Sequence, residues 1–92
     1  MQKIILNVIN EVGLHARPAS EFVKMASRFK SKILARNVTR DTASVDAKSI
    51  LSVLALGVEK GHEIELAGDG EDEEQAIKSL RELIESDFAG KF

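Results

Sequence analysis

The chain contains no cysteine, tryptophan or tyrosine, and it has one proline among 92 residues. The absence of cysteine excludes a disulfide framework and a thiolate metal site. With only two histidines, a zinc site would have to recruit carboxylates, so we expect neither a metal nor a cofactor. Without tyrosine or tryptophan, the sequence offers no pair of exposed aromatic rings on which RNA bases could stack.

Long apolar runs and a strong net charge are also missing. No run approaches the ~20 apolar residues that a membrane-spanning helix needs. The apolar start, residues 1–10, is broken by Asn7 and lacks a small-residue cleavage site, so it is typical of a strand. A formal net charge of −2 argues against a broad nucleic-acid footprint. We therefore expect one cytoplasmic domain, residues 1–92, that binds no nucleic acid and does not insert into a membrane.

Apolar periodicity predicts strands that alternate with helices. Alternation with period two predicts strands at about 2–10, 32–37 and 62–67, and a short strand centred on Val45. Helical spacing predicts helices at about 16–29, 50–56 and 72–87. Polar residues 37–42 must reverse the chain, and the glycines at 68–70 predict a turn. The order βαββαβα implies an α+β fold with an antiparallel sheet that carries its helices on one face.

The segment Gly13 to Ala19 places a histidine and an arginine where the first strand gives way to the first helix. The first turn of a helix has backbone N–H groups without intrahelical partners, and the peptide dipoles favour negative charge there. His15 is a nitrogen nucleophile beside this position, and the Arg17 guanidinium is a planar donor suited to phosphoryl oxygens. Pro18 supports the helix start. The combination predicts a histidine that carries a phosphoryl group; the alternative is a surface or capping histidine.

The short segment that follows Ser49 is apolar almost all round, with Ser52 as the single polar residue between 50 and 56. A short helix of a small domain cannot bury every side, so we expect some of Leu51, Leu54 and Ala55 to face water. Such a patch often marks a docking surface; the alternative is that neighbouring loops cover it. Ser49 itself can serve as an N-cap worth about 1 kcal/mol.

The run Gly-Leu-His-Ala-Arg-Pro-Ala resembles the active-site signature of the HPr family, the histidine-containing phosphocarriers of the bacterial phosphoenolpyruvate-dependent sugar phosphotransferase system. The resemblance extends in order through nearly the whole chain, at residues 22–24, 48–50, 56–57 and 68–73. It implies an open-faced sandwich of four strands and three helices. It also implies that enzyme I phosphorylates Nδ1 of His15, that Arg17 shields the phosphate, and that an EIIA-type domain receives the group.

The resemblance implies further roles for the neighbourhood of Ser49. In the Gram-positive branch of the family, the serine in this Lys-Ser-Ile context is phosphorylated by HPr kinase/phosphorylase, and a transcriptional regulator is then a further partner. Related carriers outside that branch keep the serine without the kinase. Ser49 can therefore be a regulatory phosphorylation site or only the N-cap of the short helix, and both interpretations stay open. The expected partner-binding residues share a place near the signature helix or the short apolar helix: Ala16, Lys24, Lys48, Leu51 and Leu54.

One residue and one connection depart from the family's pattern. Val12 stands where the family often has a polar residue, and the 37–42 connection is longer than the family's turn and lacks glycine. His62 lies far in sequence from any anion site, and we interpret it as structural. The leading interpretation is a monomeric, stoichiometric phosphoryl carrier rather than a turnover enzyme. The alternatives are a regulatory binding protein that signals through Ser49, or a carrier in a nitrogen-related or glycerone-related branch.

Overall fold

A computed structural model describes residues 1–86 and 88 of the chain. The observed order of elements is βαββαβα, which confirms the order expected from periodicity. In chain order the elements are β1 (Gln2–Asn7), α1 (Ala16–Ser27), β2 (Lys32–Asn37), β3 (Val45–Asp46), α2 (Ile50–Ala55), β4 (Glu63–Asp69) and α3 (Glu73–Glu85).

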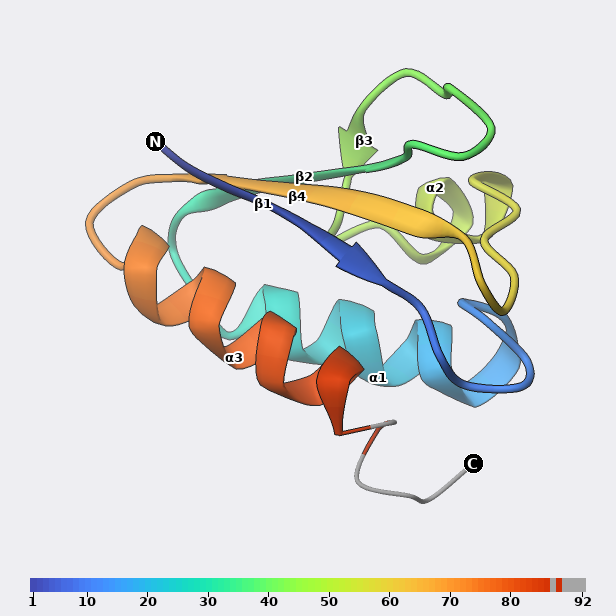
Figure 1. Cartoon of the computed structure of the whole chain (residues 1–92). Coiled ribbons are helices and arrows are strands. Elements are labelled where there is room, and N and C mark those ends of the chain that lie inside the picture. Colours follow the sequence, from blue (N-terminus) through green and yellow to red (C-terminus); the bar gives the residue numbers. More distant parts are fainter. Residues whose placement is uncertain (87, 89–92) are drawn as a thin grey trace.

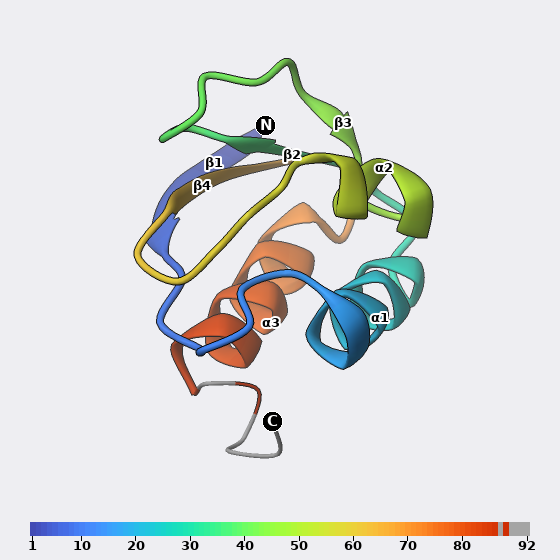
Figure 2. The ribbon, with the colours of Figure 1, turned by 90° about the vertical axis from the view of Figure 1, so that its right-hand side faces the viewer.

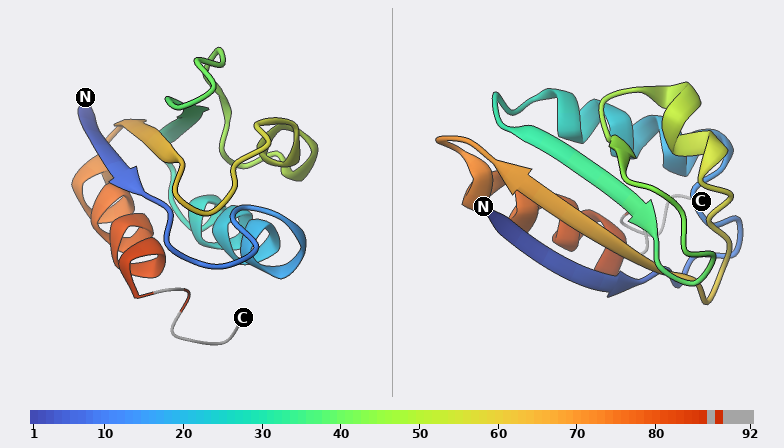
Figure 3. Two further views of the ribbon diagram at one scale, coloured as in Figure 1. Left: turned by 45° about the vertical axis from the view of Figure 1, so that its right-hand side comes forward. Right: turned by 90° about the horizontal axis from the view of Figure 1, so that it is seen from above.

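The strands form one antiparallel sheet in the order β1-β4-β2-β3. Helices α1 and α3 lie side by side across one face of this sheet, and α2 packs on α1 near β3 (Figure 1). Seen from above, the strands lie in front of α1 and α3, and no described helix covers their outer face (Figure 3). The fold is therefore the open-faced sandwich that the resemblance implied.

The core lies between the sheet and the two long helices, and the predicted apolar faces line it. In β4, Ile64 and Leu66 are fully buried while Glu63 is exposed, which confirms the predicted alternation. None of the helices in the described part of the chain combines the length and hydropathy of a membrane span. The helix residues fully or largely buried in the core are Ala19, Phe22 and Ala26 of α1, Val53 of α2, and Ala76, Ile77, Leu80 and Ile84 of α3.

The boundaries of β1 and β4 differ from expectation. β1 ends at Asn7 rather than near residue 10, since its partner strand β4 begins only at Glu63. The next residue, Val8, donates its N–H to the carbonyl of His62 (2.9 Å), which precedes β4. The predicted turn at 68–70 is wrong at its start, because β4 continues to Asp69. Gly68 pairs with Gln2 and Ile33 in the sheet, and a Cβ there would lie 3.2 Å from Ile77 Cγ1. Gly68 thus lets α3 approach the sheet closely, and the chain reverses only from Gly70.

Predicted bounds move in all three helices, and α2 ends at Ala55 rather than at residue 56. α1 ends at Ser27, two residues before the expected Phe29, and α3 runs from Glu73 to Glu85 rather than from Asp72. The expected last residue of the C-terminal helix, Asp87, lies outside the described residues.

Asp72, which precedes α3, ties this helix to the start of β2. Its carboxylate accepts hydrogen bonds from the Lys30 N–H (2.9 Å), the Ser31 N–H (2.9 Å) and the Ser31 hydroxyl. The Ser31 hydroxyl and then the Lys30 N–H lower the pKa of Asp72 to about 2. Glu73 follows the same pattern, since its carboxylate accepts the Gly70 N–H (3.2 Å) and its pKa is lowered by that bond first. The acidic start of α3 is therefore engaged within the fold.

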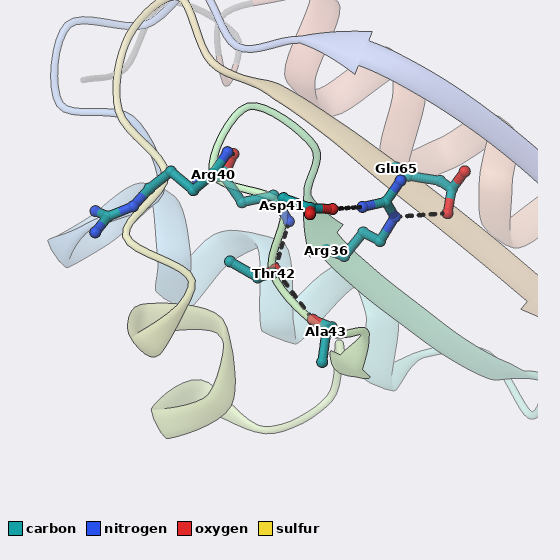
Figure 4. Close-up of polar contacts among 7 residues, drawn as sticks. Arg36, Arg40, Asp41, Thr42, Ala43 and Glu65 are labelled. Atoms are coloured by element: carbon teal, nitrogen blue, oxygen red, sulfur yellow. Dashed lines mark hydrogen bonds and ion pairs between the residues drawn. The ribbon is translucent and has the colours of Figure 1, made fainter.

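Polar side chains close the glycine-free connection between β2 and β3. The Asn37 N–H donates to Thr42 Oγ1 (2.9 Å), and the Thr42 N–H donates to the Asn37 carbonyl (3.1 Å). Asp41 adopts a left-handed φ of +52°, which aspartate tolerates better than most residues. Its carboxylate lies 3.5 Å from Arg36, which also pairs with Glu65 at 3.2 Å, while Arg40 points away from this cluster (Figure 4). The predicted reversal at 37–42 is confirmed.

Candidate functional site

His15 lies immediately before α1, at the N-cap position, with extended backbone angles (φ −125°, ψ 160°). Its side chain is partly exposed and forms no capping hydrogen bond. Within the described part of the chain, no donor or acceptor engages the ring. The capping interpretation of His15 is therefore wrong, and the imidazole is left available to an external group.

Ala16, the next residue, adopts a left-handed φ of +52° at the first position of α1. This conformation costs a non-glycine residue about 1–2 kcal/mol. Backbone strain of this kind persists only where the surrounding structure imposes it, and it is concentrated at functional sites. The packing of the preceding loop shows what imposes it here.

The site loop, residues 8–15, is held against the strap, residues 57–62. The Leu14 N–H donates to the Val58 carbonyl (3.0 Å), and both side chains are fully buried. Gly13 has φ +62°, and a Cβ there would lie 2.2 Å from the Val58 carbonyl oxygen. Only glycine fits between the site loop and the strap at this point. This explains why the signature begins with glycine two residues before the histidine.

Asn10 closes the site loop from within, and sequence reasoning missed it. Its buried side-chain amide donates to the Gly13 carbonyl (2.6 Å), while the Gly13 N–H donates to the Asn10 carbonyl (3.1 Å). Asn10 Oδ1 is buried without a partner among the described residues. The available signal was an asparagine three residues before a glycine, which is typical of a side-chain-closed turn.

Arg17 lies in the first turn of α1, exposed to solvent, and no acidic residue shares that turn. Among residues 1–86 and 88, no carboxylate pairs with its guanidinium and no acceptor meets the N–H groups of Ala16 and Arg17. The structure thus brings together an accessible imidazole, a free cation and the positive end of a 12-residue helix.

The exposed face of α2 provides a second feature of this region. Leu51 is 77% exposed, with Ile50 at 38% and Leu54 at 36%, and Ala55 is exposed as well. The expectation that this face meets water is confirmed, and the alternative that neighbouring loops cover it is wrong. Ser49 is the N-cap, and its hydroxyl accepts the Ser52 N–H (3.4 Å), which confirms its capping role. We call Ile50, Leu51 and Leu54 the α2 patch. Viewed from the side, the start of α1 and α2 gather at the same end of the molecule (Figure 2).

The two lysines expected to bind partners differ in their surroundings. Lys24 is exposed on α1. Lys48 donates through Nζ to the carbonyl of Phe29 (2.7 Å), just beyond the C-terminal end of α1. A helix of 12 residues spans ~18 Å, and His15 lies at its other end. The Lys48 ammonium is therefore engaged in the fold and is separated from His15 by the length of α1.

Two further apolar residues of the site loop are exposed. Ile9 and Val12 each expose about half of their side chains, at 50% and 47%. Val12, which stands where the family often has a polar residue, faces water and adds an apolar side chain three residues before His15. Sequence reasoning missed Ile9, although its position is out of phase with the buried Leu6 and Val8 of the same segment.

His62 lies on the strap and is engaged on one ring nitrogen. Its Nδ1 accepts the Glu59 N–H (3.1 Å) and lies 3.2 Å from Asn37 Nδ2. The ring of His62 is therefore engaged within the fold, as the structural interpretation expects. The two histidines thus have opposite environments, one ring engaged by the protein and one free.

Three comparisons with known proteins agree. A family model described as "PTS HPr component phosphorylation site" matches residues 3–86. The phosphocarrier protein HPr of Treponema pallidum is 43% identical over 83 residues, covering 90% of this chain and 91% of that protein. The multiphosphoryl transfer protein of Haemophilus influenzae is 47% identical over 75 residues, covering 82% of this chain, but the match spans only 15% of that protein.

The solved structures lead to the same family. The crystal structure of HPr-C-His from Thermoanaerobacter tengcongensis has a TM-score of 0.93 and 43% identity, with all of both chains covered. A crystal structure of an HPr dimer from the same organism has a TM-score of 0.74 and 45% identity, covering 96% of this chain and 98% of that one.

Proposed function

Because the chain belongs to the HPr family of phosphocarriers of the phosphotransferase system, we propose that it carries its phosphoryl group on His15. One observation supports this choice above the others: His15 is the histidine whose ring is unengaged, and it lies at a helix start with no acidic residue in its first turn. His62, by contrast, is engaged at Nδ1. An anion carried on His15 would meet free donors rather than competing carboxylates.

The proposed chemistry needs little beyond positioning. The neutral imidazole attacks phosphorus in line, the new nitrogen–phosphorus bond forms as the bond to the donor's leaving group breaks, and charge spreads over the phosphoryl oxygens. The family resemblance assigns the attack to Nδ1. Arg17 and the free N–H groups of Ala16 and Arg17 are the donors we assign to those oxygens. The contacts of the site loop with the strap, which hold Ala16 in its left-handed conformation, keep this turn in one shape.

We assign the donor and acceptor proteins by the same family reasoning. Enzyme I supplies the phosphoryl group that originates from phosphoenolpyruvate, and an EIIA-type domain receives it, so this protein is a stoichiometric carrier rather than a turnover enzyme. The proposed docking surface combines Ala16 and the α2 patch with Lys24 on its rim, a mixture that fits an apolar partner surface with acidic edges. Lys48 contributes less, because its ammonium already binds Phe29. A sugar branch is the leading assignment, with nitrogen-related and glycerone-related branches as alternatives.

The decisive experiment is labelling by enzyme I and phosphoenolpyruvate. We expect one acid-labile phosphate per chain, absent in His15→Ala and still reached at long times in His62→Ala. The matched variants remove the two histidines of the chain one at a time. Labelling that survives in His15→Ala would overturn the assignment.

Ser49 supports a second, regulatory function. Ser49 is partly exposed at the start of α2, two residues before the exposed Leu51. A phosphate there would add a charge of about −2 next to the α2 patch and could block one partner or recruit another, such as a transcriptional regulator. Incubation with HPr kinase/phosphorylase and ATP should give an acid-stable phosphate that Ser49→Ala lacks. If the wild-type chain stays unlabelled, this function is excluded.

We further propose that residues 1–92 act as one HPr-like domain, monomeric and cytoplasmic. The open outer face of the sheet and the edge strand β1 are the surfaces through which copies could instead pair. Sedimentation at working concentrations checks the monomer, and a dimer like that of the Thermoanaerobacter tengcongensis structure would contradict it.

A further inference from the structure

His62 is held by donors from two different parts of the fold. Its Nδ1 accepts the Glu59 N–H (3.1 Å) from its own turn and faces Asn37 Nδ2 (3.2 Å) from the end of β2. Asn37 is fully buried, and the same Nδ2 donates to the Leu56 carbonyl at the end of α2 (3.1 Å). An amide nitrogen has two hydrogens, so one can meet the Leu56 carbonyl while the other faces Nδ1, whose single lone pair also accepts the Glu59 N–H.

These contacts fix the protonation pattern of the ring. A backbone N–H can only donate, so the nitrogen that receives it must be an acceptor. Neutral His62 therefore carries its proton on Nε2, and Nδ1 is the atom that accepts the hydrogen bond within the strap.

The strap that His62 closes holds both ends of the site loop. At the start of the loop, the Gly61 N–H donates to the Val8 carbonyl (2.8 Å) and the Val8 N–H donates to the His62 carbonyl (2.9 Å). At the end of the loop, the Leu14 N–H donates to the Val58 carbonyl (3.0 Å), one residue before His15. The shape of the strap therefore sets where His15 and the strained Ala16 lie.

We propose that His62 is a positioning residue for phosphoryl transfer, acting through the acceptor at Nδ1 that keeps the strap in shape. This inference rests on the proposed function of His15. In-line transfer depends on positioning, and a displacement of ~1 Å can cost ~100-fold in rate. A strap that loosens at Glu59 moves the carbonyl of Val58 that holds Leu14, and so displaces His15.

Three substitutions separate the acceptor from the bulk of the ring. His62→Asn keeps an oxygen acceptor near the place of Nδ1, His62→Gln puts its amide near the place of Nε2, and His62→Ala removes both. Two measurements are made on the folded fraction of each: amide hydrogen exchange of Glu59, Gly61 and Leu14, and the rate of phosphoryl transfer from phosphorylated enzyme I.

For His62→Ala and His62→Gln, we expect faster exchange at these three amides and transfer slowed about tenfold, which is within the range that misplacement causes. His62→Asn should restore both to near wild-type values. Unchanged transfer in folded His62→Ala and His62→Gln would make His62 merely structural, and equal rescue by glutamine and asparagine would overturn the role of Nδ1. If the wild-type chain accepted no phosphate, the proposed function would fail, while the exchange contrast between asparagine and glutamine would still decide whether Nδ1 holds the loop.

Discussion

The starts of α1 and α3 solve the same physical problem in opposite ways. Each long helix exposes unpartnered N–H groups and a positive dipole at its first turn. At α3, the fold supplies the negative charge itself, with Glu73 and Glu74 in the first turn and Asp72 bonded to the chain before β2. In the first turn of α1, no acidic residue is present and Arg17 adds a positive charge. The α3 start is completed by acidic side chains of the protein, whereas the α1 start has no such partner among the described residues.

The two starts are also held by different forces. Charged hydrogen bonds fix α3, through Asp72 and Glu73. Backbone fit fixes α1, through the approach of Gly13 to the strap and the buried Leu14. Charge at α1 is therefore free to serve function, since stability there does not depend on it. The following predictions test this contrast, from the largest expected effect to the smallest.

Gly13→Ala should have the largest effect. The added Cβ meets the Val58 carbonyl at 2.2 Å in a left-handed conformation, so we expect a loss of about 3 kcal/mol in the free energy of unfolding. Gly61→Ala is the matched control, because its φ is +89° but no atom lies within 4 Å of the added Cβ. It should cost only about 1 kcal/mol of strain. Denaturant unfolding measures both, and equal losses would show that contact with the strap does not hold the α1 start.

Arg17→Ala should slow phosphoryl transfer by tenfold or more while the melting temperature stays nearly constant, because Arg17 is exposed and pairs with no described carboxylate. Arg17→Lys keeps the charge without the planar donor fork, so its rate should fall between the two. Arg81→Ala serves as the control, since Arg81 is exposed on α3 and pairs with Glu85 at 3.7 Å. Rapid-quench assays measure the transfer rate of each variant, and thermal unfolding measures its melting temperature. A large stability loss with normal transfer would make Arg17 structural.

Asp72 should give α3 a stability that depends on acid, a smaller effect confined to low pH. Its folded pKa is lowered to about 2 from an ordinary value of 3.8. The carboxylate therefore contributes stability that is fully present above pH ~4 and is lost as the pH falls through about 2. Asp72→Asn should lower stability at neutral pH and flatten its decline between pH 4 and 2. Urea unfolding at several pH values measures this, and an unchanged decline in the variant would assign it to other carboxylates.

Local sequence signals predicted the order of the elements and singled out His15 and Arg17, but they did not predict the contacts that hold the site loop. Alternation in β4 and the helical stripes of α1 and α3 are strong because each element buries a single face. The error at Gly68 arose because Gly-Asp-Gly has turn chemistry locally, while the packing of Ile77 depends on residues distant in sequence. The same distinction between local and distant residues applies to the site. His15 and Arg17 could be identified because they belong to one short motif. The bonds of Asn37 to His62 and of Lys48 to Phe29 join segments that only the folded chain brings together.

Leu51→Ala should have the smallest effect on stability. It tests whether the α2 patch binds a partner, as we propose for the start of α1, or serves only the fold, as the acidic start of α3 does. Leu51 is 77% exposed, so its truncation should cost under about 0.5 kcal/mol. Leu56→Ala, at the end of the same helix and 2% exposed, should cost about 2–5 kcal/mol. Affinity for enzyme I, measured by calorimetry on folded protein, should nevertheless fall for Leu51→Ala, because an exposed apolar side chain is buried only in the complex. It should stay the same for whatever fraction of Leu56→Ala remains folded. If Leu51→Ala binds enzyme I and the acceptor domain as tightly as the wild type, the α2 patch is no docking surface. The proposed docking surface is then limited to residues of α1.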